Sequence, residues 1–141
     1  MSLENIMSIS GVAMDAQTAR INLAVSNIAN VDTVESSAET AYKAKRAVFK
    51  TILEDQANHA QGEIAGGVKI KEIIEDQEPH PSFYDPSHPL SNEEGYIFSS
   101  NVDVMTEMVD IQAASRSYES AVEASNTAKR LMTRTIEMLQ R

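Results

Sequence analysis

Residues 104–139 read VMTEMVDIQAASRSYESAVEASNTAKRLMTRTIEML, and this stretch decides the fold. Alternating steps of four and three residues starting at Val104 reach eleven positions, eight of them apolar. The eleven are Val104, Met108, Ile111, Ser115, Tyr118, Val122, Ser125, Lys129, Met132, Ile136 and Leu139. This spacing predicts an α-helix with a coiled-coil-like apolar seam. The small residues Ala114, Ala121 and Ala128 lie beside the seam and would allow a neighbouring helix to approach closely.

The N-terminal residues 3–31 have the same helical spacing. All four prolines lie between Pro79 and Pro89, and Gly11 is the only glycine in either terminal segment. Because proline costs about 3 kcal/mol inside a helix and glycine about 1, both ends are free to form long helices. We expect Asn101 or Asp103 to cap the second helix. One apolar stripe of the first helix contains Ile9, Val12, Ala16, Ala19 and Leu23.

The middle of the chain has strand patterns around a proline-rich loop. Residues 68–71 alternate after two glycines, and residues 95–98 follow a turn-like segment, so both predict strands. Residues 42–53 do not distinguish a strand from a helix. We therefore predict an α+β fold with an N-terminal helix in 1–33, a small β-containing acidic middle in 34–100, and a C-terminal helix in 101–141. The two terminal helices are expected to pack as a coiled-coil-like pair.

The formal net charge is −9, and it is unevenly distributed. Residues 32–100 carry 13 acidic and 6 basic side chains, whereas the two ends are nearly neutral. An acidic middle indicates a solvated exterior, with a disordered acidic linker as the alternative. The acidic balance argues against nucleic acid or an anionic membrane surface as a partner. We also expect no direct membrane insertion and no cleaved signal peptide, because no segment has the required apolar run.

The sequence offers little chemistry for a catalytic or metal site. His59, His80 and His88 lack tight ligand spacing, and we expect His80 and His88 to be solvated loop residues. The glycine-containing segment 62–67 lacks the Lys-Ser/Thr of a phosphate loop, and the chain has no cysteine. We predict neither enzyme activity nor a cofactor nor a metal.

Residues 24–33 read AVSNIANVDT, and they resemble the N-terminal signature of the bacterial flagellar axial proteins. In that family, which builds the rod, hook and filament core, this signature ends the first helix. Residues 66–69, 84–90, 95–97 and 101–104 further resemble the C-type proximal rod proteins of the basal body. The positions that carry the resemblance include Asn27, Ala29, Asn30, Thr33, Tyr84, Pro86, Pro89 and Asn101. Ser100 is a departure, because the family usually has proline there, and residues 34–41 lack the usual glycine or proline.

The resemblance implies a structural subunit of the proximal rod, which spans the periplasm and transmits torque. It implies other rod proteins and copies of this chain as partners, and export by the flagellar type III apparatus without a cleaved signal. A coiled-coil adaptor or an export-chaperone-like binding module is the alternative, and a metal-dependent enzyme is a third class. We expect the assembly contact to join the stripe Ile9, Val12, Ala16 and Leu23 to the stripe Val104, Met108, Ile111, Tyr118 and Val122.

Overall fold

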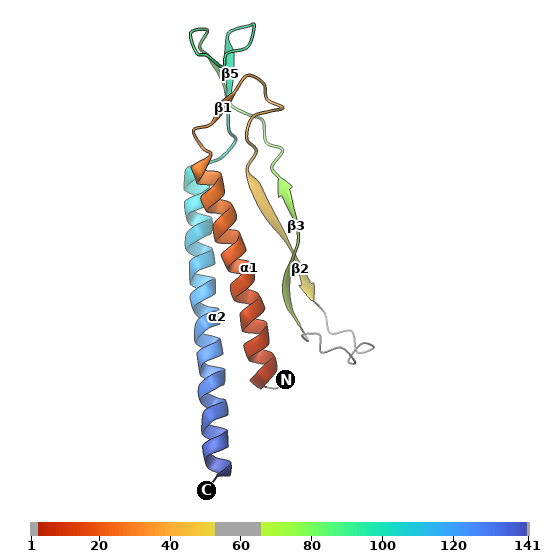
Figure 1. The fold of residues 1–141 in the computed structure, drawn as a ribbon, viewed down its shortest axis with the longest axis vertical. Helices are drawn as coiled ribbons and strands as arrows, with labels where there is room; N and C mark the ends of the chain where they lie inside the picture. Colours follow the sequence, from red (N-terminus) through yellow and green to blue (C-terminus); the bar gives the residue numbers. More distant parts are fainter. Residues whose placement is uncertain (1–2, 53–65, 141) are drawn as a thin grey trace. The chain divides into compact units, whose positions relative to one another are not determined.

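The computed structural model describes residues 3–52 and 66–140, and it confirms the α+β class (Figure 1). Helix α1 covers Leu3–Ala29 and helix α2 covers Val104–Leu139, as the spacing of apolar residues predicted. The strands of the middle region are β1 (Val34–Glu35), β2 (Lys45–Ile52), β3 (Gly67–Glu75), β4 (Ser82–Tyr84) and β5 (Tyr96–Ser99).

The chain divides into two compact units. The first contains residues 1–19, 48–72 and 113–141, and the second contains residues 20–47 and 73–112. Each helix therefore contributes to both units: α1 is divided after residue 19 and α2 after residue 112.

Alanines fill the core of the first unit. Ala16 of α1 is buried, as are Ala114 and Ala128 of α2. Two of the three small residues noted beside the predicted seam of α2 therefore lie in the buried interior. Because an alanine has no side chain beyond Cβ, these positions let the two helices approach closely but bury little apolar area.

The start of β3 packs against α1 in the same unit. Gly66 and Gly67 both have positive φ, at 95° and 132°. A Cβ added to Gly67 would lie 3.5 Å from Val12 Cγ1, and one added to Gly66 would lie 3.8 Å from Ile9 Cδ1. The glycine pair thus supplies the backbone conformation that leads into the strand and lies directly beside two apolar side chains of α1.

Two small sheets form the β structure. β5 is the central strand of a three-stranded sheet with the order β1-β5-β4, and β2 pairs with β3 in a two-stranded ribbon. β5 is antiparallel to both neighbours, with Val34 opposite Ser99 and Tyr84 opposite Tyr96. Ile97 of β5 is buried in the second unit.

Three of these elements were not predicted from the spacing of residues. The segment that did not distinguish strand from helix forms β2. The stiff loop expected between residues 78 and 89 contains a short strand, β4, because Phe83 pairs with Ile97 between the prolines. β1 lies in the segment 34–41 that departs from the family pattern.

The helix ends are made by side chains that bond to the backbone. Asp103 caps α2, because its carboxylate accepts hydrogen bonds from the backbone N–H groups of Met105 (3.3 Å) and Thr106 (3.1 Å). These bonds and one from the Thr106 hydroxyl hold the pKa of Asp103 below its ordinary value, the hydroxyl having the largest effect. At the other terminus, Asn30 ends α1: its side chain donates to the carbonyl of Ser26 (2.7 Å), and its own carbonyl accepts from Thr33 Oγ1 (2.7 Å).

Candidate functional site: the assembly surface

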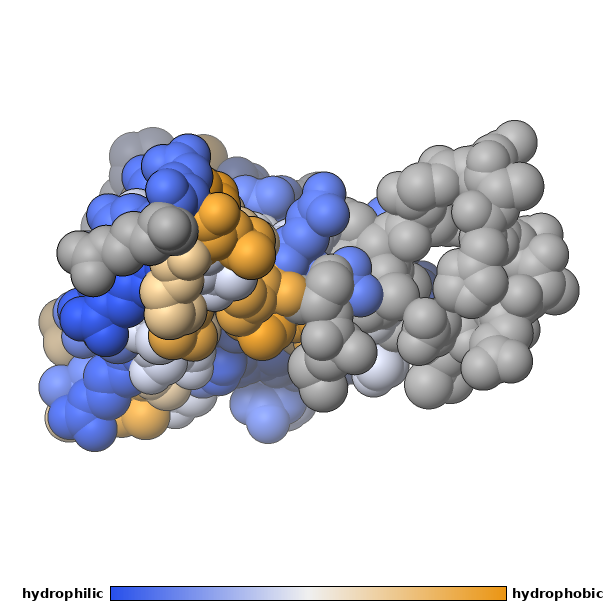
Figure 2. All heavy atoms as spheres, turned by 90° about the horizontal axis from the view of Figure 1, so that it is seen from below, coloured by the Kyte–Doolittle hydropathy of each residue, from blue (hydrophilic) through white to orange (hydrophobic). Residues whose placement is uncertain are grey.

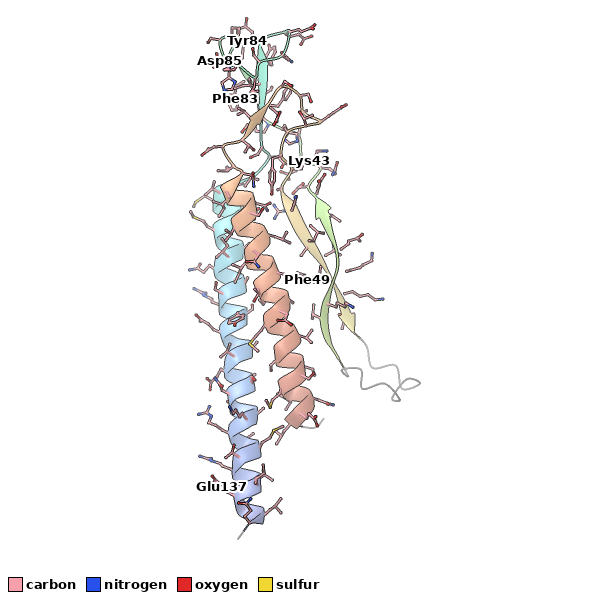
Figure 3. All side chains as sticks on the ribbon, in the orientation of Figure 1. Lys43, Phe49, Phe83, Tyr84, Asp85 and Glu137 are labelled. Carbon is pink, nitrogen blue, oxygen red and sulfur yellow. The ribbon has the colours of Figure 1, made fainter. Side chains whose placement is uncertain are left out.

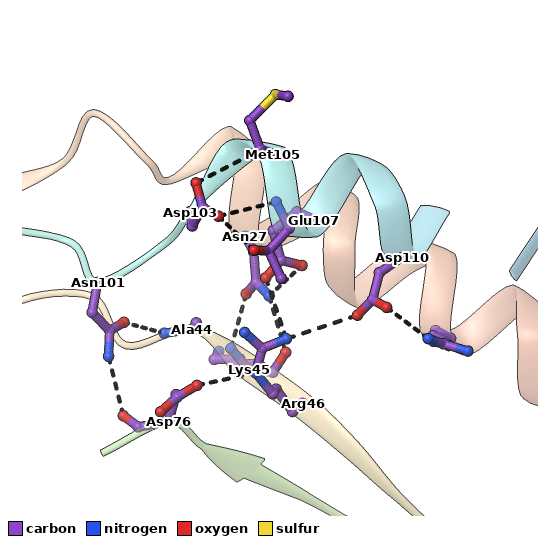
Figure 4. A network of polar contacts seen from close by, with 12 residues as sticks. Asn27, Ala44, Lys45, Arg46, Asp76, Asn101, Asp103, Met105, Glu107 and Asp110 are labelled. Carbon is purple, nitrogen blue, oxygen red and sulfur yellow. Dashed lines mark hydrogen bonds and ion pairs between the residues drawn. The ribbon is translucent and has the colours of Figure 1, made fainter. Parts of the chain in front are cut away.

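Asn27 is the centre of a polar network in the second unit (Figure 4). Its side chain is buried at the end of α1, with only 1% of the residue exposed. Asn27 Oδ1 accepts from the backbone N–H of Lys45 (2.9 Å) and from the Tyr42 hydroxyl (3.1 Å). Asn27 Nδ2 donates to the carbonyl of Lys45 (3.0 Å) and to Glu107 Oε2 (3.2 Å). One amide therefore uses both acceptor sites and both donor hydrogens to join α1, the start of β2 and α2.

Glu107 places a carboxylate in this buried position. The residue is 1% exposed, and its Oε1 has no hydrogen bond but lies 3.5 Å from Arg46 Nη1. Arg46 also contacts Asp76, with Nε 3.0 Å from Oδ2, and Asp110, with Nη1 3.8 Å from Oδ2. Arg20 of α1 contacts the other oxygen of Asp110 at 2.6 Å. A buried carboxylate is costly unless it is paired, and here it has an asparagine donor and an arginine beside it.

The ion pair between Arg46 and Asp76 shifts both groups toward their charged forms. The hydrogen bond from Arg46 lowers the pKa of Asp76, and the backbone N–H of Glu78 adds to the effect. The same hydrogen bond to Asp76 raises the pKa of Arg46 above its ordinary value.

Asn101 and Ser100 connect the segment before α2 to the sheets. Asn101 Oδ1 accepts from the N–H of Ala44 (2.7 Å), and its Nδ2 donates to the carbonyls of Asp76 (3.2 Å) and Glu78 (3.1 Å). Asn101 therefore ties the residue before β2 to the residues that follow β3, while Asp103 provides the helix cap. Ser100 is buried and donates twice, from its hydroxyl to Val31 O (2.8 Å) and from its N–H to Thr33 O (3.2 Å).

Sequence reasoning missed Glu107, Arg46 and Asp76. Each is one charged residue among many, and their spacing shows nothing because the three come from α2, from β2 and from the residue after β3. Asn27 was found, but only through the family motif. Apart from Asn101, the other motif positions lie at or just after the end of α1 (the exposed Ala29, and Asn30 and Thr33) or in the segment between Tyr84 and Pro89.

The predicted assembly residues are not all inside the helix pair. Ala16 is buried, and Leu23, Val104, Ile111 and Val122 are half-buried. Met108 is 54% exposed, and Tyr118 is exposed as well. In the single chain Ala114 and Ala128 are buried residues of α2, whereas Met108 and Tyr118 are not, and the assembly contact expected between the two stripes stays a prediction. Ile9 and Val12 lie beside the glycines at the start of β3.

α2 carries a series of exposed apolar side chains. At its start, in the second unit, these are Met105, Met108 and Val109. At its end, in the first unit, they are Leu131, Ile136, Met138 and Leu139. An end-on view shows apolar atoms at the surface among the hydrophilic side chains (Figure 2). Groups of exposed apolar side chains such as these often mark a protein–protein contact.

The two histidines of the proline-rich segment are not simple solvated residues. His80 is half-buried, with Nδ1 2.9 Å from the carbonyl of Ser99 and a buried Nε2 that has no hydrogen bond within residues 3–52 and 66–140. His88 is also half-buried, and its Nδ1 accepts from the N–H of Leu90 (3.1 Å). Both residues lie in loops, as expected, but each is partly buried and hydrogen-bonded, so neither is fully solvated. His59 lies outside the described residues, and within residues 3–52 and 66–140 no three His, Asp or Glu side chains group as metal ligands.

Comparison with known proteins identifies the family. Residues 93–138 match the family model of the C-terminal region of flagellar basal body rod proteins FlgE, FlgF and FlgG. The flagellar basal-body rod protein FlgC of Escherichia coli O157:H7 is 44% identical over 140 residues, covering 99% of this chain and all of the relative. The chain belongs to the FlgC family of basal-body rod proteins. FlgC of Salmonella typhimurium is 42% identical over 140 residues, with the same coverage, and FlgC of Bacillus subtilis is 33% identical over 143 residues, covering 94% of this chain and 95% of the relative.

Membership of the FlgC family confirms the resemblance seen in the motifs, and with it a structural role in the rod of the flagellar basal body. The match to the family model covers β5 and nearly all of α2, the elements that carry the buried Glu107 and the exposed apolar side chains. Neither helix, within the part of the chain described, combines the length and apolar character that a membrane span needs.

Proposed function

We propose that this FlgC-family chain assembles into the rod through its terminal helices, which form part of the helical axial tube and transmit torque. The observation that carries the proposal is the composition of the core. Among the described residues, the buried apolar set consists of six alanines and Ile97. The large aliphatic side chains of α2 remain exposed or half-buried.

Contact with neighbouring subunits would bury these side chains. Full burial of one Met, Val or Leu side chain contributes about 1.5–3 kcal/mol, so a few such residues per interface stabilise an assembly substantially. Met105, Met108 and Val109 are adjacent on the first turns of α2, where their burial would be shared. A torque-bearing contact made of packed apolar side chains is also insensitive to salt, unlike surface ion pairs.

The polar network gives each subunit a defined geometry before it assembles. Asn27, Glu107 and Arg46 fix the end of α1 against the start of α2, so the exposed face of α2 is presented in one orientation. Preorganisation of this kind lowers the entropy that association must overcome. The polar network supports an assembly role better than the role of a coiled-coil adaptor, because an adaptor would not need its helices joined to the β strands.

The proposed partners are copies of this chain and other rod proteins. We also propose that the chain is exported by the flagellar type III apparatus and that the rod in which it assembles crosses the periplasm, as the family resemblance implies. The predicted residues Ile9, Val12, Ala16, Leu23, Val104, Met108, Ile111, Tyr118 and Val122 remain proposed assembly positions. Met108 and Tyr118 are the best placed among them for a contact between subunits, because a single chain leaves them exposed.

Met108→Asp tests the proposal. Because Met108 is more than half exposed, an aspartate there is solvated in the single chain, and the free energy of unfolding should change by less than about 0.5 kcal/mol. In the rod the same carboxylate would be buried without a partner, so swimming and recovery of the protein in purified basal bodies should be lost. Ser120→Asp is the matched control, since it adds the same charge at an exposed polar position of α2.

The two readouts separate assembly from folding. Normal swimming with the Met108→Asp protein present in basal bodies would refute an assembling face on α2. Loss of swimming in the Ser120→Asp control would show that added charge anywhere on α2 is harmful, and it would remove the support for this face.

A further inference from the structure

The segment 81–99 displays a rigid aromatic face. Tyr84 of β4 and Tyr96 of β5 are opposite each other in the register, and their rings meet edge to face with centroids 5.3 Å apart. Tyr84 is 66% exposed, and Tyr96 is exposed too. The side chains of Phe83, Tyr84 and Asp85 project from this segment in Figure 3.

The backbone around Gly95 holds these rings in place. Gly95 has φ +81°, and a Cβ there would come within 2.9 Å of Tyr84 Cε2, so the ring lies directly over the glycine. Asn92 Oδ1 accepts from the N–H groups of Glu94 (3.0 Å) and Tyr96 (2.8 Å), and Asp85 N donates to Gly95 O (2.9 Å). A preorganised pair of tyrosines loses little conformational entropy when a partner covers it.

The charge around this face has one sign. Between residues 72 and 115 the chain has ten acidic side chains and neither lysine nor arginine. Three of the acids, Asp85, Glu93 and Glu94, flank the two tyrosines in sequence. Exposed aromatic rings beside carboxylates favour a partner that combines arginine or lysine with apolar side chains, because guanidinium groups stack on rings and pair with carboxylates.

The same chain carries such a surface at the end of α2. Residues 129–139 contain Lys129, Arg130 and Arg134 against one acid, Glu137. Leu131, Arg134 and Met138 follow spacings of three and four, so they share one face of the helix. Leu131 and Met138 are both exposed, Met138 to 70%. Arg130 is already paired with Glu123 of its own helix (2.9 Å), which leaves Arg134 as the central cation of this face.

We propose that the acidic aromatic face of segment 81–99 in one copy docks on the face Leu131, Arg134 and Met138 at the end of α2 in a second copy. This inference rests on the proposed assembly into the rod and names one of its contacts. Arg134 stacks against the exposed tyrosine pair and pairs with the flanking carboxylates, while Leu131 and Met138 cover apolar ring surface.

Such a contact is heterologous, because it joins two different surfaces of the same chain. Heterologous contacts propagate from copy to copy, and they form open helical assemblies when the rotation between copies does not close a ring. An open assembly of this kind always keeps one unused acidic face at one end and one unused basic face at the other, so further copies can add.

Crosslinking tests this contact, and the absence of cysteine in the chain makes the experiment clean. Glu94→Cys and Thr135→Cys, both at exposed positions, are combined in one chain and treated with a short bismaleimide in purified basal bodies. We expect a ladder of covalent dimers and higher multimers of this chain. The control pair Glu94→Cys with Ala124→Cys, also at an exposed position, moves the second cysteine by about three turns, or about 16 Å, along the same side of α2 and should yield no ladder.

A second measurement covers the case in which the double-cysteine variant does not enter basal bodies. The same pair in concentrated purified protein should crosslink at about 50 mM salt and several-fold less at about 500 mM, because screening weakens the charge complementarity. Added Arg134→Glu should reduce the adducts at least as strongly.

The outcomes separate this inference from the proposed function. Three results would overturn the docking of a second copy while leaving the rod role intact. They are basal bodies that contain the protein but yield no adduct, equal crosslinking of the control pair, and an adduct only with a different protein. Absence of the unmodified protein from basal bodies would instead overturn the rod role itself.

Discussion

Replacing Asn27 by alanine removes the residue that joins α1, β2 and α2. The variant leaves the N–H and carbonyl of Lys45 and the carboxylate of Glu107 without the partner they have in the structure. These groups are buried or part-buried, so water replaces the lost amide incompletely. We therefore expect Asn27→Ala to be much more damaging than the loss of a surface side chain.

The magnitude follows from the bonds. Each of the two neutral bonds to Lys45 contributes about 0.5–1.5 kcal/mol, and the bond to the charged Glu107 about 1.5–3 kcal/mol. Together these three bonds give an expected loss in the free energy of unfolding of about 2.5–6 kcal/mol, a large part of the about 5–15 kcal/mol typical of a folded domain. Tyr42→Phe is the matched control, because it removes one bond to the same amide and should cost about 1 kcal/mol.

Urea unfolding followed by circular dichroism measures both losses, and hydrogen exchange at the Lys45 amide reports on the site itself. We expect exchange at Lys45 to accelerate in Asn27→Ala, since that N–H donates to Asn27 Oδ1 (2.9 Å). An Asn27→Ala variant no less stable than Tyr42→Phe, with unchanged exchange at Lys45, would refute the central role of the amide.

Three further perturbations have expected outcomes. Gly95→Ala should destabilise the protein by about 1–2 kcal/mol, because φ is +81° and the added Cβ would collide with the Tyr84 ring. Gly11→Ala has open space on a helix and should stabilise the protein by about 0.5–1 kcal/mol. Equal shifts of the melting temperature in the two variants would contradict this. Asp76 has a folded-state pKa below its ordinary value, so its contribution to stability is present above pH about 4 and is lost as the pH falls through the folded pKa. Acid unfolding of Asp76→Asn should accordingly lose this component, and an unchanged pH profile would count against the ion pair. Joint replacement of His80 and His88 by alanine removes the hydrogen bond of each ring, which contributes about 1 kcal/mol apiece. The melting temperature should therefore fall by about 4–8 °C. Stoichiometric zinc that is present in the purified protein and absent from the variant would contradict a purely structural role.

The polar network explains why part of the site was invisible to pattern reasoning. Arg46 lies in a strand, Asp76 follows another strand, and Glu107 is one residue away from a predicted seam position. Their meeting depends on how β2, β3 and α2 pack, which no local spacing encodes. The family motif did single out Asn27 and Asn101, and in the structure the side-chain amides of both residues bridge separate backbone segments.

Local properties of the chain determined the two helices, the strands at 68–71 and 95–98 and the acidic middle, because periodicity, helix breakers and charge act over a few residues. The motifs likewise placed the chain among the flagellar rod proteins. Only the tertiary structure decided that residues 45–52 form a strand, since a mixed run of basic and apolar residues suits either element until its neighbours are present. It also decided that alanines, and not Met108 and Tyr118, face the interior of the helix pair: both stripes of α2 have helical spacing, and the choice between them depends on how closely α1 can approach.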